Sequence, residues 1–223
     1  LRAVALSPAD AAIDSRRAQM LAYQLDSTRE AIDQKQFRAR LAAYPPVLEE
    51  LSQLSDVLEA RSNLAGVPVP GLEYAPICLH AAYSLREILT AVGWLTAERR
   101  TPFQAGTLRL HDRQLELMFV TLDKSEGFHD RVAYKDYAVS SELFHWQTQN
   151  SAGPDTPAGR RYLDSAINGW SFQLFVRSTK GRAYRACGPV TLVHATGDRP
   201  MSITWRLLTP LPARLFVEFS VLK

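Results

Sequence analysis

Apolar residues recur every three to four positions through the first part of the chain, a spacing that is typical of α-helices. The pattern runs over residues 9–64 and is interrupted once, at Pro45-Pro46. Ser7 followed by Pro8 is a favourable helix start, because serine caps a first turn and proline fits within it. The sequence therefore predicts a helical hairpin or bundle, with an apolar side formed by Ile13, Met20, Leu21, Leu25, Ile32, Phe37, Leu41, Val47, Leu48, Leu51, Leu54, Val57, Leu58 and Leu64.

The segment over residues 66–71 contains two prolines and two glycines and cannot continue this helical pattern. We place a domain boundary there. The predicted organisation is a helical connector over residues 1–70 and a second domain over residues 71–223. We expect that second domain to begin with one more helix, over residues 79–93, which Gly93 ends.

Beyond Arg100 the apolar pattern changes to runs and alternations that are typical of β-strands. Residues 115–122 form a mostly apolar run suited to a buried strand, and residues 172–177 alternate as a half-buried strand does. Further strands are expected over residues 183–195, 201–208 and 215–222. The predicted fold class is α+β, with a helical hairpin or bundle followed by a twisted, barrel-like sheet.

Composition places the chain among ordinary globular proteins, with 46% hydrophobic and 22% charged residues in a total of 223. No apolar run is long enough for a membrane-spanning helix, so we expect no membrane partner. The chain begins at Leu1 without a signal-peptide pattern, and we expect it to be part of a longer cytoplasmic protein. Two cysteines without a CxxC pair indicate neither a required disulfide nor a zinc site.

The net charge of +3 is distributed unevenly. Residues 1–70 hold 8 basic and 9 acidic residues, whereas the remainder holds 18 and 14. Two groups of basic residues stand out in the second part, Arg160-Arg161 and the set Arg177, Lys180, Arg182 and Arg185. Such a surface fits a polyanion, and it equally fits a solvated hairpin tip, so both interpretations stay open.

Residues 134–150 combine aromatic rings with directed hydrogen-bonding groups. Flat rings provide stacking surfaces, while amides and a carboxylate provide oriented donors and acceptors, so the combination suits a planar polar ligand such as a nucleobase. The alternative is that the rings fill a core and the amides cap loops. The residues concerned are Tyr134, Asp136, Tyr137, Phe144, His145, Trp146, Gln147, Gln149 and Asn150.

The same segment, written Tyr-x-Asp-Tyr-Ala-x-Ser-x-x-Leu-Phe-His-Trp-Gln-x-Gln-Asn, resembles the signature of a C-terminal domain of unknown function on bacterial DEAD/DEAH-type helicases. Other motifs of that domain match in the same order, over roughly residues 75–215. They are the His-x-x-Tyr-Ser-x-x-Glu-Ile helix at 80–88, Thr-Leu-x-Lys at 121–124, Gly-Arg-Arg-Tyr at 159–162, Leu-Phe-Val-Arg at 174–177, Arg-Pro-Met-Ser-Ile-Thr-Trp at 199–205 and Leu-Pro at 211–212.

Some helicases that carry this domain are type IV restriction enzymes, in which it follows a phospholipase-D-type nuclease and a helicase motor. The resemblance implies an SRA/PUA-like fold that reads 5-methylcytosine or 5-hydroxymethylcytosine by flipping the base out of the duplex, in the manner of the SET-and-RING-associated domain. The implied partners are double-stranded DNA with modified cytosine and the helicase and nuclease domains of the same polypeptide. We expect this chain to be only the reader, without catalytic residues, metal or cofactor.

Roles for individual residues follow as hypotheses. Stacking is assigned to Tyr137 and Trp146, and Asp136 is the acceptor for the cytosine amine. The remaining base edge is assigned to Ser140, His145 and Gln147, and phosphate contacts to Arg160, Arg161, Lys180 and Arg182. Strand alternation places Phe144 and Trp146 on one face and His145 and Gln147 on the other, so only one of these pairs can line a pocket.

Two other function classes stay open. The domain could be a docking module for the helicase or another protein, with its aromatic residues in the core. It could also be a nuclease, with Glu116, Asp123 and Lys124 around magnesium, although their spacing fits poorly. A metal site made of His80, Glu87 and His145 is disfavoured, because His80 and Glu87 lie two helical turns apart.

Overall fold

The computed structural model describes residues 15–20, 34–61, 66–96, 99, 103–123 and 136–220. The chain forms two compact units, and its segments alternate between them from residue 69 to residue 103. Unit 1 comprises residues 1–68, 72–78 and 83–103, and unit 2 comprises residues 69–71, 79–82 and 104–223. The helical unit therefore includes a segment that follows the Pro/Gly-rich stretch.

Unit 1 is helical where its N-terminal part is described. Residues 15–20 are helical, α2 spans Gln34–Ala42 and α3 spans Pro45–Arg61. This confirms the expected helices within the described residues, whereas the helix start at Ser7-Pro8 lies outside them. Pro45 and Pro46 occupy the first turn of α3, where the missing N–H has no intrahelical partner to lose.

The helix expected over residues 79–93 is shorter, since α4 spans Leu85–Ala91. Its start is fixed by a capping box, in which the Glu87 backbone N–H donates to Ser84 Oγ at 3.2 Å and the Ser84 N–H donates to Glu87 Oε2 at 2.6 Å. Upstream of this cap the backbone cannot be helical, because His80 has a φ of 61° and Ala82–Tyr83 form the short strand β1. The Tyr-Ser-x-x-Glu motif is therefore a helix start.

An eight-stranded sheet is the main element of the described chain. Its strands run in the order β2-β3-β6-β7-β8-β5-β4, and β1 pairs with β7 off this path. The β3–β6 pair is parallel, and the other pairs along this path are antiparallel. The strands are β2 (Thr107–Leu110), β3 (Leu115–Asp123), β4 (Tyr137–Ala138), β5 (Leu143–Gln147), β6 (Ser171–Thr179), β7 (Tyr184–Thr196) and β8 (Ser202–Leu207).

The sheet is open, which corrects the expectation of a barrel. The strands β2 and β4 end the strand order and do not pair with each other. The physical reason lies in the size of β4, since two residues provide few backbone groups for a second partner. The helix α6 (Ala213–Phe219) packs against both β4 and β6 on the inner side instead.

That helix replaces the strand that was predicted over residues 215–222. Leu215 and Phe219 lie four positions apart and are both buried in the core, as one face of a helix requires. The intervening Val217 and Glu218 are exposed. The prediction was wrong because a short apolar run fits either period, and the core contact at i and i+4 decides between them.

The core of unit 2 lies between one face of the sheet and the helices α5 (Pro157–Leu163) and α6. Its centre is an aromatic cluster around the fully buried Trp205, whose ring lies 5.1 Å from that of Phe172, 6.2 Å from Tyr162 and 6.4 Å from Trp146. Buried rings of this size dominate the energetics of a core. This cluster therefore fixes how β5, β6, β8 and α5 pack together.

His80 provides a test of pH dependence. Its Nε2 is buried without a hydrogen-bond partner in the described structure, and burial lowers its pKa. The unfolded chain then binds a proton at this residue at a higher pH than the folded chain does, so the free energy of unfolding falls as the pH drops through about 6.5. In the variant His80→Asn the titrating imidazole is removed, and asparagine tolerates the positive φ at this position. In urea unfolding at pH 7.5 and 5.5, we expect this variant to lose less stability on acidification than the wild type; equal losses would contradict the assignment.

Candidate nucleic-acid interface

The half of the sheet formed by β4, β5, β8 and the end of β7 has one apolar and one polar face. Along β5, Phe144 and Trp146 are buried, whereas Leu143, His145 and Gln147 are half-buried on the other side. The strand β8 repeats the pattern, with Ile203, Trp205 and Leu207 buried and Ser202, Thr204 and Arg206 facing outward. We call the polar side of these strands the outer face.

Tyr137 and His145 form an aromatic stack on the outer face. They are directly opposite each other in the β4–β5 ladder, which places their side chains on the same side of the sheet. Their ring centroids lie 5.0 Å apart with an interplanar angle of 19°. Both side chains are half-buried, so part of this stack is open to solvent. The structure thus brings together Tyr137 and His145, two of the residues predicted from the sequence to bind the base.

Asp136 lies next to this stack and is 8% exposed. Its Oδ1 accepts a hydrogen bond of 2.9 Å from the backbone N–H of Gln147, which ties the start of β4 to the end of β5. The Gln147 amide Nε2 in turn donates to Ser202 Oγ on β8 at 3.4 Å. Tyr137, His145 and Gln147 on the paired strands β4 and β5, and Asp136 directly before β4, are therefore neighbours in the structure.

Ser140 lies in the turn between β4 and β5, and its hydroxyl has a local role. Ser140 Oγ accepts hydrogen bonds of 3.1 Å from the backbone N–H groups of both Glu142 and Leu143. Serine stabilises turns in this way. The hydroxyl of Ser140, which the sequence assigned to the base edge, therefore stabilises the β4–β5 turn in this structure.

Trp146 belongs to the core, which does not fit its expected stacking role. Its side chain is 7% exposed, and its ring packs edge-on against Tyr162 at 5.3 Å and at a tilt against Trp205. The physical reason is strand alternation, which points Trp146 away from His145 and into the interior. Of the two predicted stacking residues, only Tyr137 lies on the outer face.

Arg161 is also engaged in the interior, contrary to its expected phosphate contact. Its Nε donates to Oε2 of the fully buried Glu116 at 2.6 Å, and its side chain is only 11% exposed. The guanidinium lies 5.2 Å from the centre of the Trp170 ring and 5.5 Å from that of Tyr162. A cation held between a carboxylate and two rings already has its partners. We therefore remove Arg161 from the phosphate contacts.

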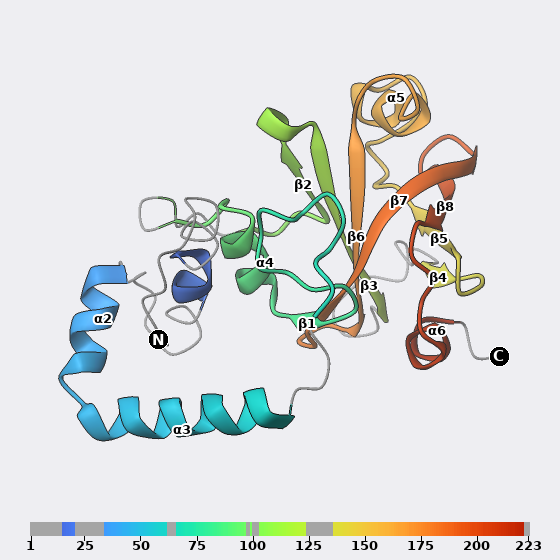
Figure 1. Ribbon diagram of the computed structural model, residues 1–223. Helices are drawn as coiled ribbons and strands as arrows, with labels where there is room; N and C mark the ends of the chain where they lie inside the picture. The colour runs from blue at the N-terminus through green and yellow to red at the C-terminus, as the bar shows by residue number, and fades with distance from the viewer. Residues whose placement is uncertain are drawn as a thin grey trace. The chain divides into compact units, whose positions relative to one another are not determined.

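The remaining predicted phosphate contacts are exposed but lie far apart (Figure 1). Arg160 is on α5, close to the start of β6, whereas Lys180 and Arg182 lie in the turn after β6. The strand β6 has nine residues, and a strand rises about 3.3 Å per residue, so roughly 26 Å separates its two ends. These residues do not form one cluster.

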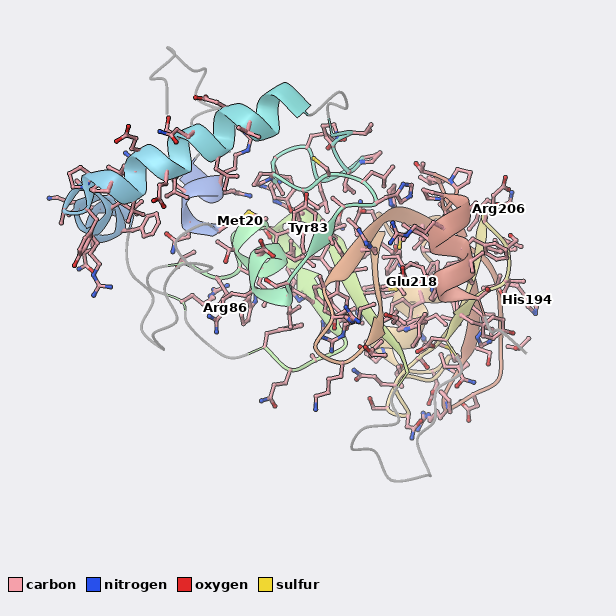
Figure 2. All side chains as sticks on the ribbon, turned by 90° about the horizontal axis from the view of Figure 1, so that it is seen from below. Met20, Tyr83, Arg86, His194, Arg206 and Glu218 are labelled. Carbon is pink, nitrogen blue, oxygen red and sulfur yellow. The ribbon has the colours of Figure 1, made fainter. Side chains whose placement is uncertain are left out.

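Three outer-face residues were missed by sequence reasoning, namely His194, Thr204 and Arg206. The alternation of residues 201–208 already separated Thr204 and Arg206 from the apolar positions. Strand pairing supplies the information that the sequence lacked. It places Thr204 opposite His145 of the stack and His194 opposite Thr204, with Arg206 two residues further along β8. Figure 2 shows Arg206 and His194 at the same outer edge of unit 2.

Other chemistries find less support in the described residues. Within the described ranges no group of three or more His, Cys, Asp or Glu side chains is placed to hold a metal ion. Glu116, considered as a nuclease residue, has its carboxylate occupied by Arg161 and by the Tyr162 hydroxyl at 2.7 Å, while Lys124 lies outside the described residues. Among the helices that the structure describes, none is long and apolar enough to cross a bilayer.

Comparisons with known proteins identify a family for this chain. The chain has no match among the curated proteins. Among solved structures, it is similar to the crystal structure of Arabidopsis thaliana SUVH6 in complex with SAM, with 12% identity and a TM-score of 0.39. That match covers 74% of this chain and 33% of the other. Residues 77–219 match the model of a domain of unknown function, DUF3427, and the chain therefore belongs to the DUF3427 family.

Proposed function

We propose that unit 2 binds DNA that contains 5-methylcytosine or 5-hydroxymethylcytosine and that it holds the modified base, flipped out of the duplex, at the Tyr137–His145 stack. In this proposal the chain is the non-catalytic, cytoplasmic recognition part of a helicase-linked type IV restriction enzyme. The observation that carries the proposal is the partly open aromatic stack beside Asp136, on a sheet face that also presents hydroxyl, amide and guanidinium groups.

The energetics of this arrangement are consistent with base flipping. Extrusion of a base costs a few kcal/mol in lost stacking and pairing, and stacking on an aromatic side chain returns about 1–3 kcal/mol. In this proposal the cytosine amine is assigned to the Asp136 carboxylate, an acceptor that thymine, which has no amine there, cannot use. Burial of one methyl group adds only about 0.8 kcal/mol, so the preference for the modified base is expected to be modest.

The test is binding of the full chain to short duplexes with and without 5-methylcytosine, measured by fluorescence anisotropy. We expect Tyr137→Ala to weaken binding to the methylated duplex by about 1–3 kcal/mol, because the stacking surface is lost. Tyr137→Phe keeps the ring and should bind like the wild type. The control is Val139→Ala, since Val139 is exposed in the adjacent turn. A preference for methylated DNA that survives Tyr137→Ala would show that the base is held elsewhere.

The second candidate function, docking on other domains or proteins, is favoured by one observation in unit 1. Several large apolar side chains are exposed around α3, among them Tyr44, Val47, Leu54 and Val57. Exposed apolar groups at helical spacing often mark a contact surface. We therefore propose docking as a role for these helices, separate from base recognition by unit 2.

A further inference from the structure

Thr204 lies at the centre of a polar cluster that spans three strands of the outer face. In the β5–β8 ladder it is directly opposite His145, and in the β7–β8 ladder it is directly opposite His194. Arg206 lies two residues further along β8 and therefore points to the same side of the sheet. The bulge between Leu192 and His194 in β7 contributes to this geometry, because it turns His194 outward while Leu192 stays opposite the buried Trp205.

The cluster is exposed and carries groups that bind anions. Arg206 and His194 are exposed, and the hydrogen bonds and ion pairs between described residues include neither side chain. The guanidinium of arginine matches a phosphate with two parallel donors, and a threonine hydroxyl or an imidazole N–H adds a further donor. No aspartate or glutamate occurs in β5, in β8 or in the part of β7 that pairs with β8. The nearest acids along the chain are Glu142 and Asp198, both outside these strands.

We propose that Arg206, Thr204 and His194 bind the phosphate backbone of the DNA strand whose base occupies the Tyr137–His145 stack. This inference rests on the proposed function and adds the phosphate-binding surface to it. Tyr137, His145, Thr204 and His194 follow one another across four strands. At a strand spacing of about 4.8 Å, this row spans roughly 14 Å, which corresponds to about four base steps of one DNA strand. With the DNA strand laid along this row, the phosphates next to a nucleotide at the stack would lie over Thr204 and Arg206.

The cluster at Thr204 does not include the basic residues that the sequence predicted as phosphate contacts. Arg161 is paired with Glu116, and the β6–β7 turn with Lys180 and Arg182 lies at the end of β6 away from α5. By contrast, His194 and Thr204 continue the row that contains the stack, and Arg206 is a diagonal neighbour of both histidines, at about 7–8 Å between Cα atoms. Proximity to the stack therefore favours the cluster at Thr204.

The experiment measures the affinity of the full chain for methylated and unmethylated duplexes of equal length between 50 and 300 mM salt. Each phosphate contact contributes about 0.9 to the slope of log K against log salt concentration. We expect Arg206→Ala to reduce this slope by about 1 and to weaken binding to both duplexes equally, by about two- to fivefold at 150 mM salt. Arg206→Lys keeps the charge and should restore the slope. The matched control is Arg109→Ala, an exposed arginine on β2 at the far end of the strand order.

The outcomes separate this inference from the proposed function. An unchanged slope in Arg206→Ala, or a loss of slope in the Lys180→Ala/Arg182→Ala double variant alone, overturns the phosphate surface and leaves base reading intact. A wild type that binds both duplexes equally, with a slope that still falls in Arg206→Ala, overturns base reading and supports the phosphate surface. Circular dichroism of each variant confirms that the fold is retained, so that lost affinity reflects lost contacts.

Discussion

Replacing Glu116 with alanine is expected to lower the free energy of unfolding by about 3–5 kcal/mol, because it leaves a largely buried arginine without its counter-charge. The Glu116 side chain is fully buried on β3, and its two oxygens accept from Arg161 Nε at 2.6 Å and from the Tyr162 hydroxyl at 2.7 Å. Burial, followed by the Glu116 charge, raises the pKa of Tyr162, so its hydroxyl stays protonated and donates. The variant loses all of these contacts and creates a cavity beside Phe172, the partner of Glu116 in the ladder.

Urea unfolding followed by circular dichroism measures this loss. Glu116→Gln keeps the side-chain volume and one acceptor but not the charge, and should have an intermediate effect. Replacing Glu116 and Arg161 together by methionine should recover most of the stability, because an apolar pair of similar size avoids the desolvation of two charges. Asp155→Ala, which breaks the exposed ion pair with Arg199, is the control and should have a much smaller effect. A Glu116→Ala variant as stable as this control would disprove the network.

Trp146→Ala is expected to cost about 3–5 kcal/mol of stability, as large aromatic truncations in a core do. The ring contacts Tyr162 and Trp205, which are themselves packed in the core, so the space that it leaves would be filled only in part. The neighbouring residue on the same strand gives the opposite result. His145→Ala removes a half-buried side chain from the outer face, so its effect on stability should be small, whereas its effect on DNA binding should be clear.

These two neighbours form a paired experiment, with urea unfolding and anisotropy measured on each variant. Trp146→Phe is the informative companion, because it preserves much of the packing and should retain the preference for methylated DNA. If Trp146→Phe abolished that preference while the protein remained folded, the ring would act at the base after all. If His145→Ala were the destabilising change, the two faces of β5 would have been assigned the wrong way round.

Four long strands of unit 2 were predictable because each carries its own apolar signal, whereas the short strands β1, β2 and β4 were not predicted, and β6 is buried on both faces where half-burial was expected. The runs at residues 115–122 and 172–177 correspond to β3 and β6, and the stretches at residues 183–195 and 201–208 correspond to β7 and β8. The pattern of apolar residues within each strand could not show which strands pair with one another. The open edge at β4 and the helix α6 both depend on which surfaces meet in the core, and that information lies in residues distant along the chain.

The candidate site shows the same division. Alternation identified two faces of β5, but only the pairing with β8 shows that Trp146 joins Trp205 in the interior while His145 faces outward. The local sequence gives no reason to distinguish Arg160 from its neighbour Arg161. Glu116, 45 residues earlier, makes one of them a buried ion-pair partner and leaves the other exposed. His194 was not predicted because its outward position depends on a bulge.

The parallel pairing of β3 with β6 has a consequence for synthesis of the protein. In the sequence, β4, β5 and α5 all lie between these two strands, and β7, β8 and α6 follow them. A ribosome therefore releases β3, already next to β2, long before β6 exists, and the growing chain exposes the edge of β3 that β6 will cover. Contacts between distant segments form slowly, and exposed strands invite aggregation. We expect nascent chains that end before Phe219 to require a chaperone, and the domain to acquire protease resistance only after α6 has left the exit tunnel.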